Sequence, residues 1–188
     1  LKETVSEEYV EEIKKELLAI PEKIEAVLEN QEGVKKYAAE NYEQRDIYFL
    51  GRGVDYAVAL EGSLKLKEIS YIHCDAYAGG ELKHGPIALI DKGTAVITLL
   101  TQEALKDKMI SNVREVSTRG GNIFAIANQG DEIAKTVAEE VVYIPKTVDL
   151  LTPLVSVVPL QLLSYYVAKN KGCDVDKPRN LAKSVTVE

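Results

Sequence analysis

Three charged residues at helical spacing could carry acid–base chemistry. Glu61, Lys65 and Glu68 are separated by four and three positions, so on a helix they form one polar stripe. A solvated Glu–Lys pair is the ordinary explanation of such spacing, because these pairs are common on helix surfaces. The segments on either side of this predicted helix favour a functional interpretation.

A connection rich in titratable groups and glycines follows the predicted helix. Residues 73–86 read HCDAYAGGELKHGP, and loops of this kind often hold function. His84 is a candidate general acid or base, because the unperturbed pKa of histidine lies near neutrality. We expect His73 to be a packing histidine near the helix end, and Cys74 to be a small buried residue.

The sequence ends in a segment without helical periodicity, residues 174–188. Arg179 and Lys183 stand there among apolar residues. This composition leaves two interpretations open: a loose tail with surface lysines, or a tail folded back over a site. A lysine near other cations can have its pKa lowered and can attack a carbonyl group to form a Schiff base.

Short apolar runs that alternate with helical patterns must position these residues. The chain has 188 residues, 46% of them hydrophobic and 28% charged, as in a folded globular domain. Buried strands are expected at 47–50, 95–100, 123–127 and 141–144, and helices at 54–71, 103–118, 131–140 and 149–169. The fold class is therefore α/β, a parallel sheet with helices on both faces and ligands at the carboxyl ends of the strands.

The two flanking regions are also predicted to be helical. The first 42 residues are dense in Glu and Lys with apolar residues at three- and four-residue spacing, which predicts a helical collar or linker. Its second helix should begin at Pro21, and a third should follow a break near Gly33. Residues 150–168 carry no charge, a length that suits a membrane span, but their prolines and polar residues favour a helix buried between protein layers.

A glycine-containing turn follows the first predicted strand. Gly51, Arg52 and Gly53 lead directly into a helix, a position where a ligand can approach the backbone and the helix N-terminus favours an anion. Tyr56 stands where a dinucleotide-binding fingerprint would have its third glycine. A tight strand-to-helix turn explains the glycines equally well.

Composition and cysteine usage exclude several classes of function. An excess of 30 Asp and Glu over 23 Lys and Arg gives a net charge of −7, which argues against a nucleic-acid partner. Cys74 and Cys173 lie far apart and, with two histidines, make no usual zinc site, so reduced thiols and a cytoplasmic location are expected. The sequence begins at Leu1 and its only methionine is Met109, so we expect a piece of a longer chain.

Three segments carry a resemblance to a known family. They are LGRGVDYAVALEGSLKLKEISYIHCDAYAGGELKHGPIALI (50–90), VPLQLLSYYVA (158–168) and DVDKPRNLAKSVTVE (174–188). Together they closely resemble the C-terminal end of the glutamine–fructose-6-phosphate aminotransferases, also called glucosamine-6-phosphate synthases, over essentially all of residues 46–188. The resemblance implies a flavodoxin-like SIS (sugar isomerase) fold. It makes residues 1–42 a helical linker between two SIS domains, residues 43–173 the second SIS domain, and residues 174–188 the active-site tail.

The resemblance also implies a reaction and a role for each site residue. Ammonia released from glutamine by a separate N-terminal domain reaches fructose 6-phosphate, and the isomerase half then forms glucosamine 6-phosphate. Lys183 matches the lysine that forms a Schiff base with the sugar, Glu68 the carboxylate that moves the proton between C1 and C2, and Lys65 its supporting lysine. His84 matches a histidine tied to ring opening that comes from the neighbouring subunit, which implies a homodimer. Ala182 matches a backbone contact to the sugar phosphate, and neither a cofactor nor a metal is implied.

Two parts of the family's machinery are missing from this sequence. The Ser/Thr-rich loop that holds the sugar phosphate belongs to the first SIS domain, and Ser111, Ser117 and Thr118 fall within or at the end of a helical pattern instead. The glutamine-hydrolysing domain is also absent. Three hypotheses follow: half of an isomerase site, which the catalytic set favours; a SIS module that binds sugar phosphates without turnover; and a fragment that only dimerises. In the first hypothesis the chain needs the first SIS domain for phosphate affinity, so we expect the chain to be inactive alone.

Overall fold

Five parallel strands form the centre of the molecule. The computed structural model describes residues 4–181, and its sheet has the order β2-β1-β3-β4-β5. The strands are β1 Asp46–Gly51, β2 His73–Ala78, β3 Ala95–Leu100, β4 Asn122–Asn128 and β5 Glu140–Ile144. Every neighbouring pair is parallel, and the strand order reverses between β1 and β3. The predicted α/β class with a flavodoxin-like sheet is confirmed.

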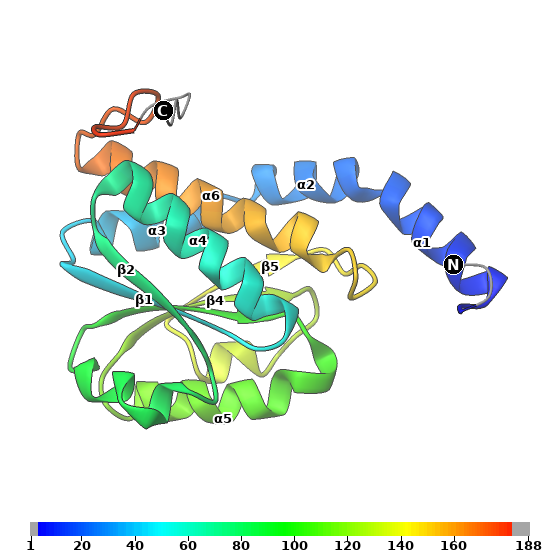
Figure 1. Ribbon diagram of the computed structural model, residues 1–188, viewed down its shortest axis with the longest axis horizontal. Helices are drawn as coiled ribbons and strands as arrows, with labels where there is room; N and C mark the ends of the chain where they lie inside the picture. The colour runs from blue at the N-terminus through cyan, green and yellow to red at the C-terminus, as the bar shows by residue number, and fades with distance from the viewer. Residues whose placement is uncertain (1–3, 182–188) are drawn as a thin grey trace, which may run out of the picture.

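Helices cover both faces of the sheet. They are α1 Glu7–Leu18, α2 Ile20–Glu29, α3 Glu32–Asn41, α4 Val54–Ser70, α5 Lys106–Ser117 and α6 Thr152–Asn170. Figure 1 shows α3, α4 and α6 above the sheet and α5 below it. This three-layer arrangement follows from parallel strands, whose crossover helices must bury both sheet faces.

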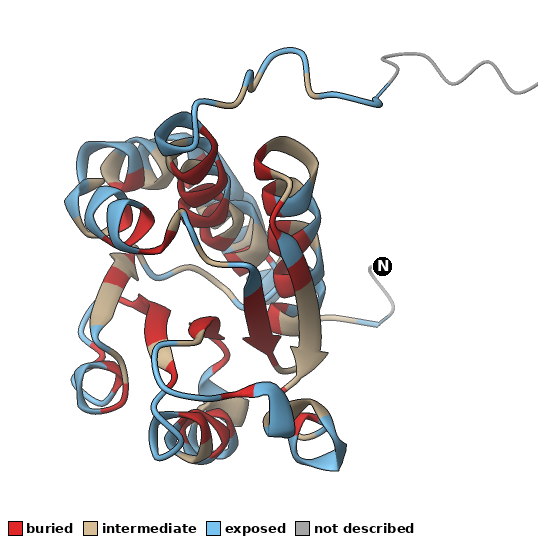
Figure 2. Ribbon diagram, turned by 90° about the vertical axis from the view of Figure 1, so that its left-hand side faces the viewer, coloured by how far each residue is buried: buried red, intermediate tan, exposed pale blue. Residues whose placement is uncertain are grey.

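Alternate residues of each strand pack into two separate hydrophobic cores, one on each face of the sheet. Ile47 and Phe49 of β1 pack with α3, α4 and α6, whereas Tyr48 and Leu50 pack with α5 on the opposite face. In Figure 2 the buried residues accordingly line the inner sides of the helices and the sheet between them. Because both faces are covered, the central strands are continuous apolar runs, which is the pattern that made them predictable.

The uncharged segment 150–168 forms most of α6. This helix packs against α4, and ten of its residues are buried, including Pro159 in its interior. The prediction of a helix buried between protein layers is confirmed. Among the described residues, none of the helices is long and apolar enough to cross a membrane.

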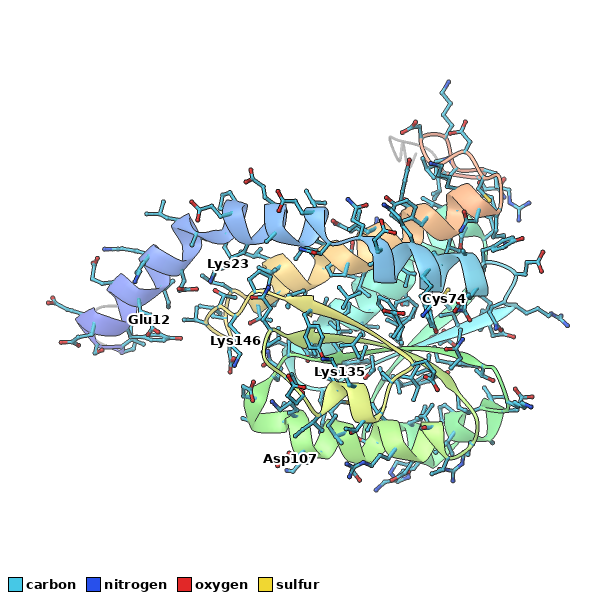
Figure 3. All side chains as sticks on the ribbon, turned by 180° about the vertical axis from the view of Figure 1, so that it is seen from behind. Glu12, Lys23, Cys74, Asp107, Lys135 and Lys146 are labelled. Carbon is cyan, nitrogen blue, oxygen red and sulfur yellow. The ribbon has the colours of Figure 1, made fainter. Side chains whose placement is uncertain are left out.

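The N-terminal helices begin and end close to the predicted positions. Pro21 lies in the first turn of α2, and Gly33 lies at the start of α3. Helix α3 packs into the main core through Val34 and Tyr37. Helix α1 has no buried residue and projects beyond the sheet (Figure 1). On α2, Lys23 donates a hydrogen bond of 2.6 Å to the carbonyl oxygen of Lys146, which follows β5 (Figure 3).

The segment predicted as one long connection contains a strand. Residues 73–78 form β2, which pairs with β1 at the edge of the sheet. The residues of β2 are mostly half-buried, so polar His73 and Asp75 stand where a central strand would carry apolar residues. The connection proper is therefore only residues 79–94, which include the short 3-10 turns η1 Leu82–His84 and η2 Pro86–Leu89.

The helix predicted over 131–140 is wrong. Only the 3-10 turn η4, Ala134–Thr136, forms there, and β5 begins at Glu140. The carboxylate of Asp131 accepts hydrogen bonds from the backbone N–H groups of Ile133 (2.8 Å) and Ala134 (3.0 Å). An aspartate that binds nearby backbone N–H groups in this way favours a turn over a continuing helix.

Candidate active site

Helix α4 positions the predicted acid–base pair. Its inner face buries Val58, Ala59 and Leu66 against the sheet and α6, so the stripe with Lys65 and Glu68 faces outward. Because α4 connects two parallel strands, it starts near the carboxyl end of β1 and ends near the amino end of β2. The pair therefore lies toward the amino edge of the sheet, and not at the carboxyl edge where ligands were expected.

Lys65 and Glu68 form a close ion pair. The distance from Lys65 Nζ to Glu68 Oε2 is 2.6 Å, and the distance to Glu61 Oε1 is 4.0 Å. The hydrogen bond that Lys65 donates to Glu68 raises the pKa of Lys65, and burial opposes that rise only in part. Lys65 is therefore a stable ammonium ion at neutral pH, held against a carboxylate that keeps 31% of its side chain exposed.

The start of the C-terminal tail lies beside this pair. Two hollows lie beside the Lys65–Glu68 pair, with volumes of about 640 and 550 Å³. Lys65, Glu68 and Leu181 line both hollows. The first is completed by Ile69, Val175, Asp176, Lys177 and Pro178. The second is completed by Leu64, Lys67, Tyr71, Arg179 and Asn180. Residues 174–181 therefore lie beside the carboxyl end of α4, and the rest of the tail, 182–188, lies outside the described residues.

Tyr71 joins the tail to the end of α4. The backbone N–H of Arg179 donates a hydrogen bond of 2.9 Å to Tyr71 Oη, and the guanidinium carbon lies 4.2 Å from the centre of the tyrosine ring. Residue spacing does not point to Tyr71. An aromatic residue at a helix end where glycine is usual is the only local signal that could have drawn attention to it.

The other predicted site residues do not meet Glu68 within the described chain. Ala182 and Lys183 lie outside the described residues. His84 is exposed and ends η1, whose Leu82 packs into the core on the α5 face. Helix α4 covers the opposite face, so a single chain leaves His84 on the other side of the sheet from Glu68.

The glycine turn after β1 is filled by the chain's own atoms. A Cβ atom on Gly51 would lie 2.4 Å from the carbonyl group of Asp55, and Gly53 has a φ of +59°. Arg52 Nη1 donates a hydrogen bond of 3.1 Å to Asn112 of α5. These features are those of a tight strand-to-helix turn.

A buried carboxylate closes the same turn. Asp55 is 3% exposed and accepts hydrogen bonds from the backbone N–H of Thr101 (2.9 Å) and from the Thr101 hydroxyl. Burial raises the pKa of Asp55, although both hydrogen bonds oppose the rise. Local spacing in the sequence does not reveal the contact between Asp55 and Thr101, because the two residues are 46 positions apart.

Cys74 and His73 are the remaining candidate residues from the sequence. Cys74 is fully buried, and burial raises the pKa of its thiol to about 12, so it is a small core residue as predicted. His73 was expected to pack near a helix end, which is wrong: it begins β2, its side chain is 65% exposed, and Nδ1 lies 2.8 Å from Asp46 Oδ1. Within residues 4–181, His, Cys, Asp and Glu side chains form no group of three or more that could hold a metal ion.

Comparison with known proteins places this geometry in a family. The chain is 62% identical over 187 residues to the glutamine–fructose-6-phosphate aminotransferase (isomerizing) of Clostridium tetani, covering 100% of this chain and 31% of that enzyme. The enzyme of the same name from Thermus thermophilus is 51% identical over 181 residues, with 96% and 30% covered. The chain thus corresponds to a part, about a third in length, of these enzymes.

Structural comparison gives the same result. The C-terminal domain of the glucosamine–fructose-6-phosphate aminotransferase from Francisella tularensis superposes with a TM-score of 0.86 at 37% identity, covering 94% of this chain and 50% of that one. The model of the SIS domain matches residues 42–170, which include all five strands and the Lys65–Glu68 pair. This chain belongs to the SIS domain family.

Proposed function

We propose that this chain is the second SIS domain of an enzyme that makes D-glucosamine 6-phosphate from D-fructose 6-phosphate and L-glutamine. The observation that carries the proposal is the 62% identity to an aminotransferase of that name over this whole chain. In this proposal residues 1–42 join it to a first SIS domain, residues 43–173 form the second, and residues 174–188 are the active-site tail. A glutaminase domain elsewhere in the parent protein supplies ammonia, in the cytoplasm.

The chemistry assigned to this chain is aldose–ketose isomerisation. Lys183 attacks the C2 carbonyl of the open sugar and loses water to form a protonated imine. Ammonia then replaces Lys183 at C2, which frees the lysine and leaves a protonated fructosimine. Glu68 removes the proton from C1, the imine nitrogen accepts the electron pair, and the same carboxyl group returns the proton to C2 while the C1 hydroxyl loses its proton to become the aldehyde. Atoms and charge balance, because one proton moves from C1 to C2 and the positive charge of the imine leaves with the proton of the C1 hydroxyl.

The Lys65–Glu68 geometry supports these roles. A general base must be held in place, and the ammonium group of Lys65 lies 2.6 Å from Glu68 Oε2. A Schiff-base lysine instead needs a lowered pKa. The pKa of Lys65 is raised, so Lys65 suits the supporting role and leaves the nucleophile to another lysine, for which Lys183 is the candidate.

The proposal assigns His84 to the site of a second subunit. His84 and Glu68 belong to opposite faces of one sheet, so a shared site requires two chains. A homodimer in which His84 assists ring opening in the partner's site meets this requirement. Ala182 would contact the sugar phosphate through its backbone.

Deuterium exchange tests the isomerase role directly. Fructose 6-phosphate is incubated in D2O with the parent protein that contains this chain, and deuterium at C1 is followed by NMR. We expect exchange with the native protein and a loss of at least 100-fold with Glu68→Gln, because a positioned general base contributes about 10²- to 10⁴-fold. Glu61→Gln, on the same stripe but 4.0 Å from Lys65, is the matched control and should stay within about twofold.

A non-catalytic sugar-phosphate-binding module gives a different outcome. Such a module would bind fructose 6-phosphate in calorimetry and leave C1 unexchanged with and without Glu68. Equal exchange rates in the native protein and Glu68→Gln would contradict the assigned base.

A further inference from the structure

Two residues near the proposed site have an unusual backbone conformation. Within the range 4–181, Tyr71 (φ 61°) and Asn180 (φ 62°) are the two residues other than glycine with a positive φ. Both line the hollow that contains Lys65 and Glu68. Such conformations cost free energy and persist where the surroundings hold them, commonly near functional sites.

The conformation of Tyr71 brings its side chain to the tail. Tyr71 is the residue that caps α4, a position where glycine is usual because it has no Cβ atom. Its ring lies against the guanidinium group of Arg179 at 4.2 Å, and its Oη accepts the Arg179 backbone N–H at 2.9 Å. One side chain thus fixes both the backbone and the side chain of a residue 108 positions away.

The point of attachment determines what the tail can reach. Leu181, two residues beyond Arg179, lines both hollows beside Lys65 and Glu68. Lys183 follows Leu181 by two residues in the sequence. Fixing Arg179 therefore fixes the start of the tail beside Lys65 and Glu68.

We propose that Tyr71 is a positioning residue that clamps the start of the tail through Arg179, so that Lys183 meets the sugar beside Glu68. The inference rests on the proposed function, in which Lys183 is the nucleophile. A misplacement of about 1 Å at a reacting group can reduce a rate by about 100-fold. The clamp thus acts on the rate of imine formation through geometry, without touching the sugar.

A purely structural role for Tyr71 makes a different prediction. If Tyr71 only ended α4, replacement by glycine would be harmless, because glycine adopts a positive φ without strain. The variant Tyr71→Gly therefore keeps the helix end and removes the clamp. Tyr71→Phe keeps the ring and removes only the hydrogen-bond acceptor for Arg179.

The first measurement needs no sugar. The δ-CH2 protons of Arg179, observed by NMR in the 188-residue chain, should be shifted upfield by the tyrosine ring. In Tyr71→Gly they should move to the position of an exposed arginine while Tm stays equal or rises, and in Tyr71→Phe most of the shift should remain. Tyr165→Leu, which removes a tyrosine 41% exposed on α6, is the control and should leave Arg179 unchanged. Identical Arg179 shifts in Tyr71→Gly and the native chain would overturn the clamp.

The second measurement concerns the reaction. In the parent protein, with saturating fructose 6-phosphate and borohydride, Tyr71→Gly should slow the modification of Lys183 at least about tenfold, Tyr71→Phe should show a smaller loss, and Tyr165→Leu should stay within twofold. Equal rates in Tyr71→Gly and the native protein would overturn the positioning role. If the native parent protein forms no adduct, the proposed function fails, and the NMR measurement on the 188-residue chain still decides whether Tyr71 holds the tail.

Discussion

The two ends of α4 differ in how they use their polar groups. At the amino end, Gly51 lies against the backbone of Asp55, and the Asp55 carboxylate is buried and bonded to Thr101. At the carboxyl end, Lys65 and Glu68 stay partly exposed beside two hollows. The glycine turn, which suggested an anion site in the sequence, is occupied by the chain itself.

The polar groups at the amino end of α4 therefore serve stability, and those at its carboxyl end serve the proposed reaction. Polar groups at the amino end satisfy each other, so they hold the turn and are not free to bind a ligand. Those at the carboxyl end have exposed atoms and a neighbouring tail. We therefore expect substitutions at the amino end to change the free energy of unfolding, and substitutions at the carboxyl end to change the reaction.

The largest effect on stability should come from Gly51→Ala. Its Cβ atom would lie 2.4 Å from the carbonyl carbon and oxygen of Asp55, and backbone atoms cannot move aside cheaply. We expect a loss of about 3 kcal/mol in the free energy of unfolding, measured by urea denaturation. Gly172→Ala is the control, because Gly172 has a φ of +71° in open space and should lose only about 1 kcal/mol. Equal losses in the two variants would contradict the close packing of the turn.

A smaller loss should follow from Thr101→Val. The variant removes the hydroxyl donor to Asp55 and leaves a buried carboxylate with one fewer partner. We expect about 2 kcal/mol less stability at pH 7, since an unsatisfied buried polar group costs about 1–3 kcal/mol. Thr118→Val, whose hydroxyl donates to the carbonyl oxygen of Glu115 at an exposed site, should change little and serves as the comparison.

Asp55 should also make the free energy of unfolding depend on pH, and this change should be smaller than the losses in Gly51→Ala and Thr101→Val. Burial raises its pKa above the ordinary 3.8, so the folded chain binds this proton more tightly than the unfolded chain. That stabilisation is complete below pH 3.8 and is lost as pH rises through the folded-state pKa. Asp55→Asn should therefore remove a decline in stability above pH 3.8, measured by urea denaturation at a series of pH values.

Asp131 provides the control of opposite sign. Burial raises the pKa of Asp131, but the N–H of Ala134 and the ammonium group of Lys106 outweigh it, so the pKa is lowered. Its stabilisation is present at neutral pH and is lost as pH falls below the ordinary 3.8. If the free energy of unfolding depends on pH in the same way for Asp55→Asn and the native chain, the raised pKa of Asp55 is contradicted.

The smallest change in stability should come from Lys65→Met. The pair with Glu68 is close but its side chains are 36% and 31% exposed, so solvent weakens it. We expect a change of about 0.3 kcal/mol or less by urea denaturation, together with a clear loss, in the parent protein, of deuterium exchange at C1 of fructose 6-phosphate. A loss of more than 1 kcal/mol would mean that this end of α4 also serves mainly stability.

The sequence was most informative where burial is uniform. Strands β1, β3 and β4 are predictable because both sheet faces are covered and their residues are buried in succession. Strands β2 and β5 lie at the two edges of the sheet. Strand β5 was still predictable because residues 141–144 are apolar, whereas β2 was missed because His73 and Asp75 replace apolar residues there. The predicted helix over 131–140 failed because Asp131 binds two backbone N–H groups, a local competition that periodicity does not register.

The site was predictable only in its local part. The spacing of Lys65 and Glu68 places them on one helix face, and the structure confirms their contact. The contact of Tyr71 with Arg179 joins residues 108 positions apart, and no spacing rule reaches that far. The separation of His84 from Glu68 likewise depends on which sheet face each segment covers.

Borohydride trapping of the parent protein with fructose 6-phosphate, followed by peptide mapping, tests the central claim most directly. The chain has several lysines near the proposed site, and the method identifies the one that carries the reduced sugar. The account predicts the adduct on Lys183, because Lys65 is held as an ammonium ion by Glu68. An adduct mainly on Lys65, or none on any lysine, would contradict it.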